Sequence, residues 1–334
     1  MVCLRIRSRI VGVTFPVVLM YMLAASARAQ TGIELLTKNW EDNTSIEVND
    51  LSGSFYAPGH EEDEPGRFTL NQVQSDGRAR FGTIPGVAEG QKLFYVGYDV
   101  NYLDLSSHGH LLPDRLLDTS VAAGFPIAQF SGNNILAVSG GVGYAGDNPF
   151  AQRTGAYGKG DLLLIHEFEP GRELAIGIDY DGNRTADPDI PIPGFGYRAP
   201  WNSKIDYVIG FPYDSIEWRP WKLLTLSADY EFPEGATGTI SIRPIAHTRV
   251  FLTYRQEQDG FHVDDDPYDR RLFFLQQRAE LGVEMIPLNG LELTVAAGYA
   301  FDQRFYSGFD LSNLDIVTAV SDVPYVRCNV TFRF

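Results

Sequence analysis

The sequence predicts an all-β protein, an antiparallel transmembrane β-barrel of 12 to 14 strands. Three observations predict this fold: apolar and polar residues alternate in many segments, the connections alternate between short and long, and the last strand ends on an aromatic residue. Alternation gives a strand one apolar and one polar face. A soluble sandwich would bury the apolar face against a second sheet, whereas a membrane barrel turns it toward lipid and keeps the polar face in its lumen.

The last strand, residues 324–334, shows the alternation most clearly. Its apolar face consists of five side chains: Val326, Cys328, Val330, Phe332 and Phe334. Its polar face consists of four: Arg327, Asn329, Thr331 and Arg333. The same period recurs in four other segments, at 93–102, 174–181, 224–232 and 291–302. Helical spacing persists nowhere for long, so no substantial helix is expected in the mature domain.

Twelve strands follow from this pattern: 93–105, 115–127, 133–146, 160–168, 172–181, 203–213, 222–232, 236–243, 247–257, 270–286, 290–306 and 324–334. Residues 44–57 and 67–82 form one more hairpin, which gives fourteen strands, or residues 30–92 remain a periplasmic extension. The barrel itself is expected over 93–334.

The connections between these strands alternate in length. The short ones contain turn residues, at 169–172, 218–221, 243–247 and 287–290, and the long ones are polar, at 106–114, 147–159, 182–202, 258–269 and 307–323. Short periplasmic turns and long external loops are typical of outer-membrane barrels. With the last loop outside the cell, Phe334 lies at the periplasmic rim, and Trp218 and Trp221 flank a periplasmic turn near the lipid headgroups.

The first 29 residues predict a secretory signal peptide. Arg5, Arg7 and Arg9 precede an apolar run, and Ala27 and Ala29 form an A-x-A cleavage site before Gln30. The alternative is an N-terminal membrane anchor, for which the apolar run is short. Cleavage removes four arginines and no acid, which leaves 23 basic against 43 acidic residues and a formal charge of −20.

This acidic balance argues against a nucleic-acid partner, because phosphate binding requires clustered Lys and Arg. Only Cys328 remains after cleavage, so the mature chain has neither an internal disulfide nor a cysteine-based zinc site. Outside the signal peptide, no run of 18 apolar residues predicts a membrane helix. We expect a protein exported through the inner membrane to the bacterial outer membrane, with its lipid as partner.

No catalytic residue, cofactor or metal site is expected. The histidine pair His108 and His110 lies in an expected external loop, where a solvated loop is favoured over a metal site. Two acidic segments, 179–189 and 262–269, contain several Asp residues without the twelve-residue calcium-loop pattern. Hydrated external loops, which could bind divalent cations or bridge lipid phosphates, are the favoured interpretation.

Strand alternation also predicts the lumen lining. The expected lining includes eight charged residues: Asp99, Asp179, Asp229, Glu231, Arg278, Glu280, Glu284 and Glu292. Acid predominates, and rings of Asp and Glu favour cations. The first functional hypothesis is therefore a passive pore for small polar or cationic solutes. The second is a non-conducting structural or binding barrel plugged by loops or by residues 31–92, and the least favoured is a lipid-modifying enzyme at the rim.

Two sequence features resemble known outer-membrane proteins. The apolar positions Val326, Val330 and Phe332 before the terminal Phe334 resemble the signal by which the barrel-assembly machinery recognises its substrates. Segments 111–127 and 189–202, with the closing strand, resemble a family of bacterial outer-membrane β-barrels classed as a domain of unknown function. The resemblance implies the barrel fold and this assembly partner, and it implies no catalytic residues.

Overall fold

The computed structural model describes residues 31–37, 44–62, 66–82, 94–107, 111–130, 133–151, 153–169, 171–233, 235–263 and 270–334. Its strands are β1 (Ile46–Tyr56), β2 (Thr69–Phe81), β3 (Phe94–Ser106), β4 (Arg115–Phe130), β5 (Asn134–Gly146), β6 (Ala156–Glu169), β7 (Arg172–Asp181), β8 (Ile192–Asn202), β9 (Ile205–Phe211), β10 (Tyr213–Trp221), β11 (Leu224–Glu231), β12 (Gly235–Ile245), β13 (Thr248–Phe261), β14 (Arg271–Leu288), β15 (Leu291–Gly308), β16 (Leu314–Val320) and β17 (Val323–Arg333).

One short helix, α2 (Glu34–Thr37), precedes the strands. No helix in the described part of the chain is long and apolar enough to cross a membrane. The expected signal peptide, the histidine pair at 108–110 and the acidic run at 264–269 lie outside the described residues.

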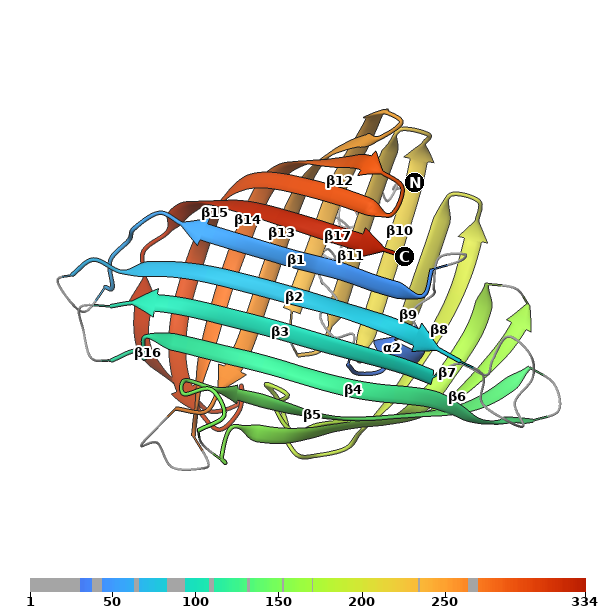
Figure 1. The fold of residues 1–334 in the computed structure, drawn as a ribbon, viewed down its shortest axis with the longest axis horizontal. Helices are drawn as coiled ribbons and strands as arrows, with labels where there is room; N and C mark the ends of the chain where they lie inside the picture. The colour runs from blue at the N-terminus through green and yellow to red at the C-terminus, as the bar shows by residue number, and fades with distance from the viewer. Residues whose placement is uncertain are drawn as a thin grey trace, which may run out of the picture.

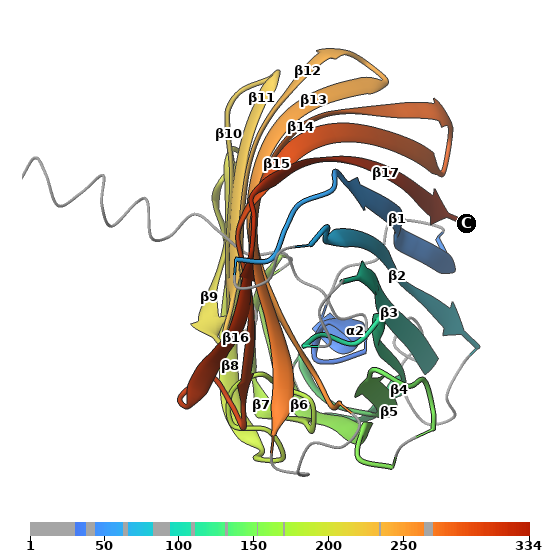
Figure 2. The ribbon, with the colours of Figure 1, turned by 90° about the vertical axis from the view of Figure 1, so that its left-hand side faces the viewer.

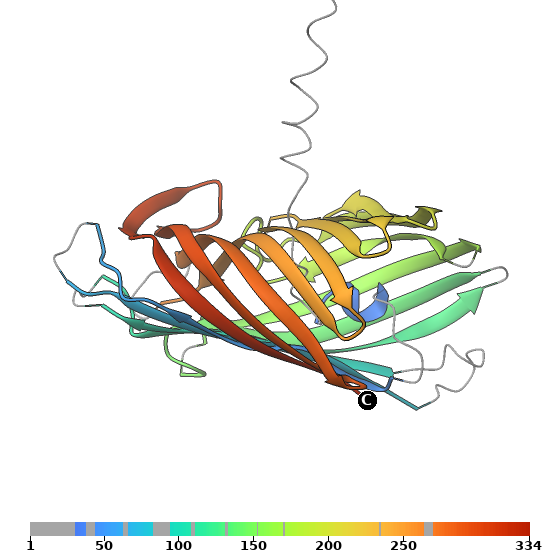
Figure 3. The same cartoon turned by 90° about the horizontal axis from the view of Figure 1, so that it is seen from above.

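The strands form one closed antiparallel barrel (Figures 1 and 3). Each strand from β1 to β15 pairs with the next, β15 pairs with β17, and β17 pairs with β1. The ring is closed at its seam by the antiparallel ladder of β1 and β17, which runs from Glu47 opposite Arg333 to Tyr56 opposite Tyr325. Beyond the ladder, Ile46 N donates to Phe334 O at 2.9 Å and Phe334 N donates to Ile46 O at 2.8 Å. Sixteen strands, β1 to β15 and β17, make up the ring.

Strands β16 and β17 are two halves of one long strand. Both run antiparallel to β15 on the same edge, with Gln303 opposite Val320 and Ala300 opposite Val323. Residues 321–322 separate the two halves, and the register with β15 also shifts once within β16, between Phe305 and Tyr306. The expected loop at 307–323 is therefore largely a strand that extends the barrel wall.

The count of sixteen corrects the expected twelve to fourteen. The expected hairpin at 44–57 and 67–82 corresponds to β1 and β2, and the two strands that the sequence pattern missed are β8 and β10. β8 contains Pro193 and Pro200, and β10 contains Pro220, and proline argues against a strand because it has no N–H to donate. In both strands the prolines stand near the ends, where few ladder hydrogen bonds are lost.

The two faces of each strand differ as the alternation predicts. In β15, Val295 is 51% exposed on the outer surface whereas its neighbour Thr294 is 8% exposed on the inner one. The alternation changes phase at Asp302, where φ is 50° and the register with β14 shifts. This bulge turns Phe305 inward, so that it is fully buried.

The ends of the barrel differ in their connections. We call the end with connections 170–171, 203–204, 222–223, 246–247 and 289–290 the short-turn end, and the end with 57–68, 107–114, 147–155, 182–191 and 262–270 the long-loop end. The longer connection 82–93 also lies at the short-turn end, and the short connections at Pro212 and at 232–234 lie at the long-loop end. Near the long-loop end the barrel is filled by an apolar core with residues from β1 to β4 and from β13 to β17. Phe305 lies at its centre, stacked on Phe274 at 4.6 Å and edge-on to Phe68 at 6.4 Å.

The opposite orientations of Val295 and Thr294 give a direct test of the fold. Val295→Arg places a charge on the apolar outer surface and should destabilise the protein in a bilayer by about 2 to 4 kcal/mol. Thr294→Arg places the same charge on the inner surface, beside Glu284, and should cost much less. Unfolding by denaturant in lipid vesicles measures both values, and equal losses would contradict the assigned faces of β15.

Candidate functional site: the lumen

The lumen contains three neighbouring cavities. The ion-pair cavity, about 380 Å³, lies between β1 to β3 and β11 to β17 and is lined by Arg249, Arg255, Glu280, Glu284, Glu292, Arg327 and Arg333, among others. The acidic cavity, about 500 Å³, lies between α2 and β7 to β11. The loop cavity, about 60 Å³, lies near the long-loop end. Ser227 lines the first two cavities, and Asp99 lines the first and third.

In the ion-pair cavity, acids on β14 and β15 are matched by arginines on β13 and β17. Glu284 lies opposite Arg249 in the strand register and pairs with it at 2.6 Å. Glu280 accepts hydrogen bonds from Arg327 Nε at 3.1 Å and from the Tyr325 hydroxyl at 2.9 Å. Glu292 pairs with Arg333 in the same way. Opposite charges therefore largely cancel along this wall.

A buried network around Arg278 joins β13 and β14 to β1 and β2 across the two strands that separate them in the ring. Arg278 on β14 pairs with Glu257 on β13 and donates to the Tyr56 hydroxyl on β1 and to Gln72 Oε1 on β2, each at 3.1 Å. Tyr56 also donates to Gln276 Oε1 at 3.2 Å. The network lies beside the apolar core, to which Tyr56 belongs. Core and network together fill the space between these strands at this level.

Among the described residues that line the acidic cavity, carboxylates outnumber arginines. It is lined by six carboxylates, from Glu34, Glu173, Asp206, Glu217, Asp229 and Glu231, and by two arginines, Arg198 and Arg219. Arg219 pairs with Asp206 at 3.4 Å and with Glu217. The strand register places Asp229 and Glu231 on β11 opposite Ser215 and Tyr213 on β10, so all four side chains share the lumen face.

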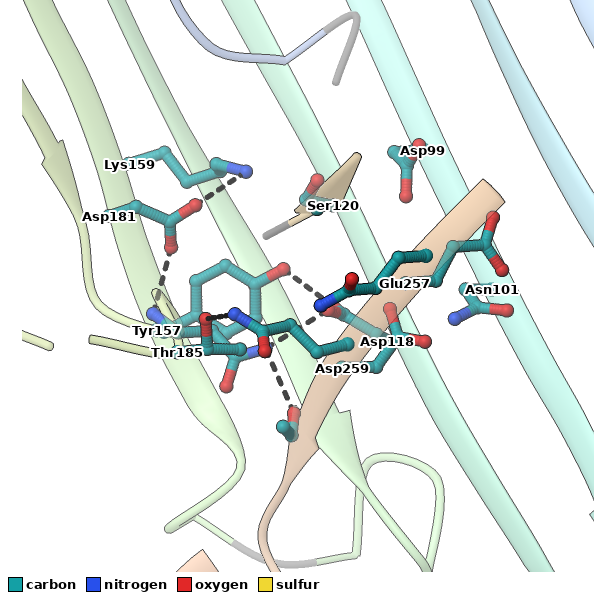
Figure 4. A pocket seen from close by; sticks show the side chains of 15 residues that line it. Asp99, Asn101, Asp118, Ser120, Tyr157, Lys159, Asp181, Thr185, Glu257 and Asp259 are labelled. Carbon is teal, nitrogen blue, oxygen red and sulfur yellow. Dashed lines mark hydrogen bonds and ion pairs between the residues drawn. The ribbon is translucent and has the colours of Figure 1, made fainter. Parts of the chain in front are cut away.

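The loop after β7 folds inward over the long-loop end. Arg271 donates to the carbonyl and side-chain oxygens of Asn183, at 3.1 and 3.0 Å, and to the carbonyl of Arg184 at 2.8 Å. Asn183 in turn donates to Asp118 at 3.0 Å. Figure 4 shows the result in the loop cavity, where Gln258 also reaches Thr185 and Tyr157 donates to Asp118. We call residues 183–185, held by Arg271, the latch.

His262 ties the next loop to the same end of the barrel. Its backbone N–H donates to Ala145 O and its carbonyl accepts from Asp147 N, both at 3.2 Å. Burial and, to a smaller extent, the nearby Arg271 guanidinium lower the pKa of His262 to about 4. Since this value lies below the ordinary 6.5, neutral His262 stabilises the folded loop above pH 6.5, and that contribution is lost as the pH falls toward 4.

The eight expected lumen residues all lie on strand faces that point inward, but in different settings. Asp229 and Glu231 line the acidic cavity, and Glu280, Glu284 and Glu292 line the ion-pair cavity. Asp99 lines two cavities, Arg278 belongs to the buried network, and Asp179 pairs with Arg184. Their role as pore lining stays a prediction. The sequence analysis missed Glu257, the lumen position of α2 and the latch.

Two carboxylates of the acidic segment 179–189 form ion pairs within the chain. Asp179 pairs with Arg184, and Asp181 pairs with Lys159 at 2.8 Å. In the described residues, no group of three or more His, Cys, Asp or Glu side chains is arranged to hold a metal ion. Within the described structure, this segment therefore anchors the latch.

Among known proteins, only solved structures are similar to this chain. No family model matches the chain, and no curated protein matches it, so the resemblance to a domain-of-unknown-function family stays an expectation. The COG4313 outer membrane channel from Pseudomonas putida F1 is 10% identical, with 89% of this chain and 97% of that chain covered and a TM-score of 0.37. The toluene transporter TodX of P. putida is 9% identical, with 93% of this chain and 96% of that chain covered and a TM-score of 0.39. OccAB4 of Acinetobacter baumannii is 10% identical, with 89% of this chain and 100% of that chain covered and a TM-score of 0.38.

The latch can be tested at Arg271. Arg271→Met removes the donors to Asn183 and Arg184 and leaves buried acceptors unpaired, which costs about 1 to 3 kcal/mol. Hydrogen exchange of the amides at 183–185 should therefore accelerate by about 5-fold to 150-fold. Arg270→Met is the matched control, because Arg270 bonds instead to Asp315 at 3.1 Å. Equal exchange in both variants would show that Arg271 does not hold the loop.

Proposed function

We propose that this protein is an outer-membrane barrel that passively conducts small polar solutes and prefers cations. One observation carries the proposal: an apolar outer surface surrounds a polar lumen, and the larger of its cavities, about 500 Å³, has an excess of carboxylates. A pore lined by Asp and Glu favours cations because the field in a low-dielectric channel is focused on the path.

The membrane location is supported by the outer surface. Apolar side chains such as Val142, Leu281 and Val295 are exposed along the middle of the strands. Trp201 and Trp221 are exposed at the short-turn end, where amphipathic rings favour the headgroup level. Tyr230 and Tyr299, also exposed, form part of a second aromatic belt toward the long-loop end. We place the short-turn end in the periplasm.

The cation preference is supported by the charges of the two large cavities. Among the described lining residues, the ion-pair cavity has six carboxylates and four arginines, and the acidic cavity has six carboxylates and two arginines. Glu280, Glu284 and Glu292 are each matched by an arginine, so they add little net field. We therefore assign the preference chiefly to Asp229 and Glu231, on the wall that faces α2.

The second candidate is a non-conducting barrel. The apolar core, the Arg278 network and the latch all reduce the open cross-section near the long-loop end, and these contacts favour a closed interior. The two candidates differ in one measurable property, the passage of ions across a bilayer.

Purified protein in a planar bilayer tests the proposal. We expect discrete conductance steps, and under a salt gradient a reversal potential that indicates cation preference. The preference should weaken as the Debye length falls from about 10 Å at 0.1 M to about 3 Å at 1 M salt. A folded protein without conductance would favour the closed barrel.

Two variants locate the selectivity. Asp229→Asn with Glu231→Gln should shift the reversal potential toward zero, because two carboxylates leave the acidic cavity. Glu169→Gln is the control, since Glu169 lies at the end of β6, at the short-turn rim, and pairs with Arg172. An unchanged potential in the double variant, or anion preference in the parent protein, would contradict the assignment.

We also propose that the C-terminal residues Val326, Val330, Phe332 and Phe334 are recognised by the barrel-assembly machinery. Phe334 is exposed on the folded barrel and stacks on Phe332, with ring centroids 6.1 Å apart, so the alternate apolar positions of the last strand end in a pair of aromatic rings. Deleting Phe334 should leave the protein degraded or in the periplasm. Normal amounts of heat-modifiable protein in the outer membrane after this deletion would contradict the proposal.

A further inference from the structure

The N-terminal segment 31–37, which includes α2, lies inside the barrel (Figure 2). Its helix contacts β3, β4 and β5. Thr31 is fully buried, and its hydroxyl shares a hydrogen bond of 2.9 Å with the hydroxyl of Ser120 on β4. Leu35 is 1% exposed. We call this segment the insert.

The wall beneath the insert has only small side chains or none. The inner faces of β4 and β5 carry small residues where the insert lies: Ala122, Gly124, Ala137, Ser139 and Gly141. A Cβ atom on Gly124 would lie 2.8 Å from Leu36 Cδ2, closer than carbon atoms can approach. A side chain at Gly124 therefore forces the Leu36 side chain to move, and a bulky one competes with the insert for this position. The small residues and the insert fit each other.

The opposite side of the insert faces the acidic cavity. Ile33, Glu34 and Thr37 line this cavity together with Asp229 and Glu231 on β11. The insert is thus one wall of the cavity, and β7 to β11 form the other. Without the insert, the cavity would open onto the inner faces of β4 and β5.

We propose that the insert narrows the conducting path and that Glu34 contributes to its cation preference. This inference rests on the proposed channel function. Thr31 follows the expected cleavage site at Ala29 by two residues, so with that cleavage the insert would be at the amino-terminal end of the exported chain. The insert confines solutes to the acidic side of the lumen and adds one carboxylate to it.

Three variants test the insert in planar bilayers. Gly124→Leu fills the space on β4 where the insert packs and should displace the insert, and deletion of 31–37 removes it. Both changes should raise the single-channel conductance and move the reversal potential toward zero. Glu34→Gln should move the potential toward zero with little change in conductance. The control is Gly140→Leu on β5, where an added Cβ meets nothing within 4 Å. Heat-modifiability verifies that each variant is folded.

The outcomes separate this inference from the proposed function. If the parent protein conducts and the displaced, deleted and Glu34→Gln variants behave identically to it, the inference fails and the channel stands. If the parent protein shows no conductance and the variant lacking 31–37 conducts ions, the result supports an insert that blocks the lumen.

If no variant conducts, the channel fails and hydrogen exchange decides whether the insert is docked. The amides of Leu35 and Leu36 donate to Gly32 O and Ile33 O, at 3.0 and 3.1 Å. These amides should be protected in the parent and lose protection in Gly124→Leu, while Gly140→Leu should keep it. Equal protection in all three proteins, or none in the parent, would overturn docking at this position.

Discussion

The pairing of β1 with β17 is the constraint on which the rest of the structure depends. An open sheet edge in a membrane would leave a row of N–H and C=O groups without partners, each at a cost of several kcal/mol. The seam between Ile46 and Phe334 satisfies these groups and fixes the barrel at sixteen strands. Once the ring is closed, every polar face points into one shared lumen. A ring of this size encloses more space than its own wall side chains can fill.

The chain fills this space in three chemically different ways. An apolar core packs near the long-loop end, the Arg278 network bonds β14 to β1 and β2, and the insert covers β3 to β5. The buried pair of Arg278 and Glu257 must keep both partners, because removal of one leaves an uncompensated charge and costs about 3 to 5 kcal/mol. The same rule applies to Glu280 and Arg327. Both pairs lie within one part of the wall, between β13 and β14 and between β14 and β17.

Local alternation was enough to predict much of the fold. It assigned the faces of β7, β11, β15 and β17, because each side chain's direction depends only on its parity within its own strand. It failed at β8 and β10, where prolines near the strand ends concealed the pattern. It also could not predict the bulge at Asp302, since that change of phase comes from pairing with β14.

The sequence predicts which residues face the lumen, but it does not predict which of them pair with one another. Parity placed Glu280 and Glu284 inside, but their partners depend on register across the sheet. Tyr56 and Arg278 are 222 positions apart and meet only after closure. The arginines that neutralise the acids of β14 and β15 lie on β13 and β17. An estimate of the lumen charge from acids alone therefore overstates the field along this wall.

Wall height explains why the charges are distributed unequally. β14 and β15 are 18 residues long, whereas β9 and β11 have 7 and 8. The long strands have enough inner positions to place acids and arginines side by side, so their charges cancel. The short strands cannot reach the apolar core, and the lumen beside them stays open and acidic. Near the long-loop end the latch folds over the lumen, and farther inside the insert forms a wall of the acidic cavity. In the proposed channel, the two elements would act in series on one path, the latch on access and the insert on width and charge.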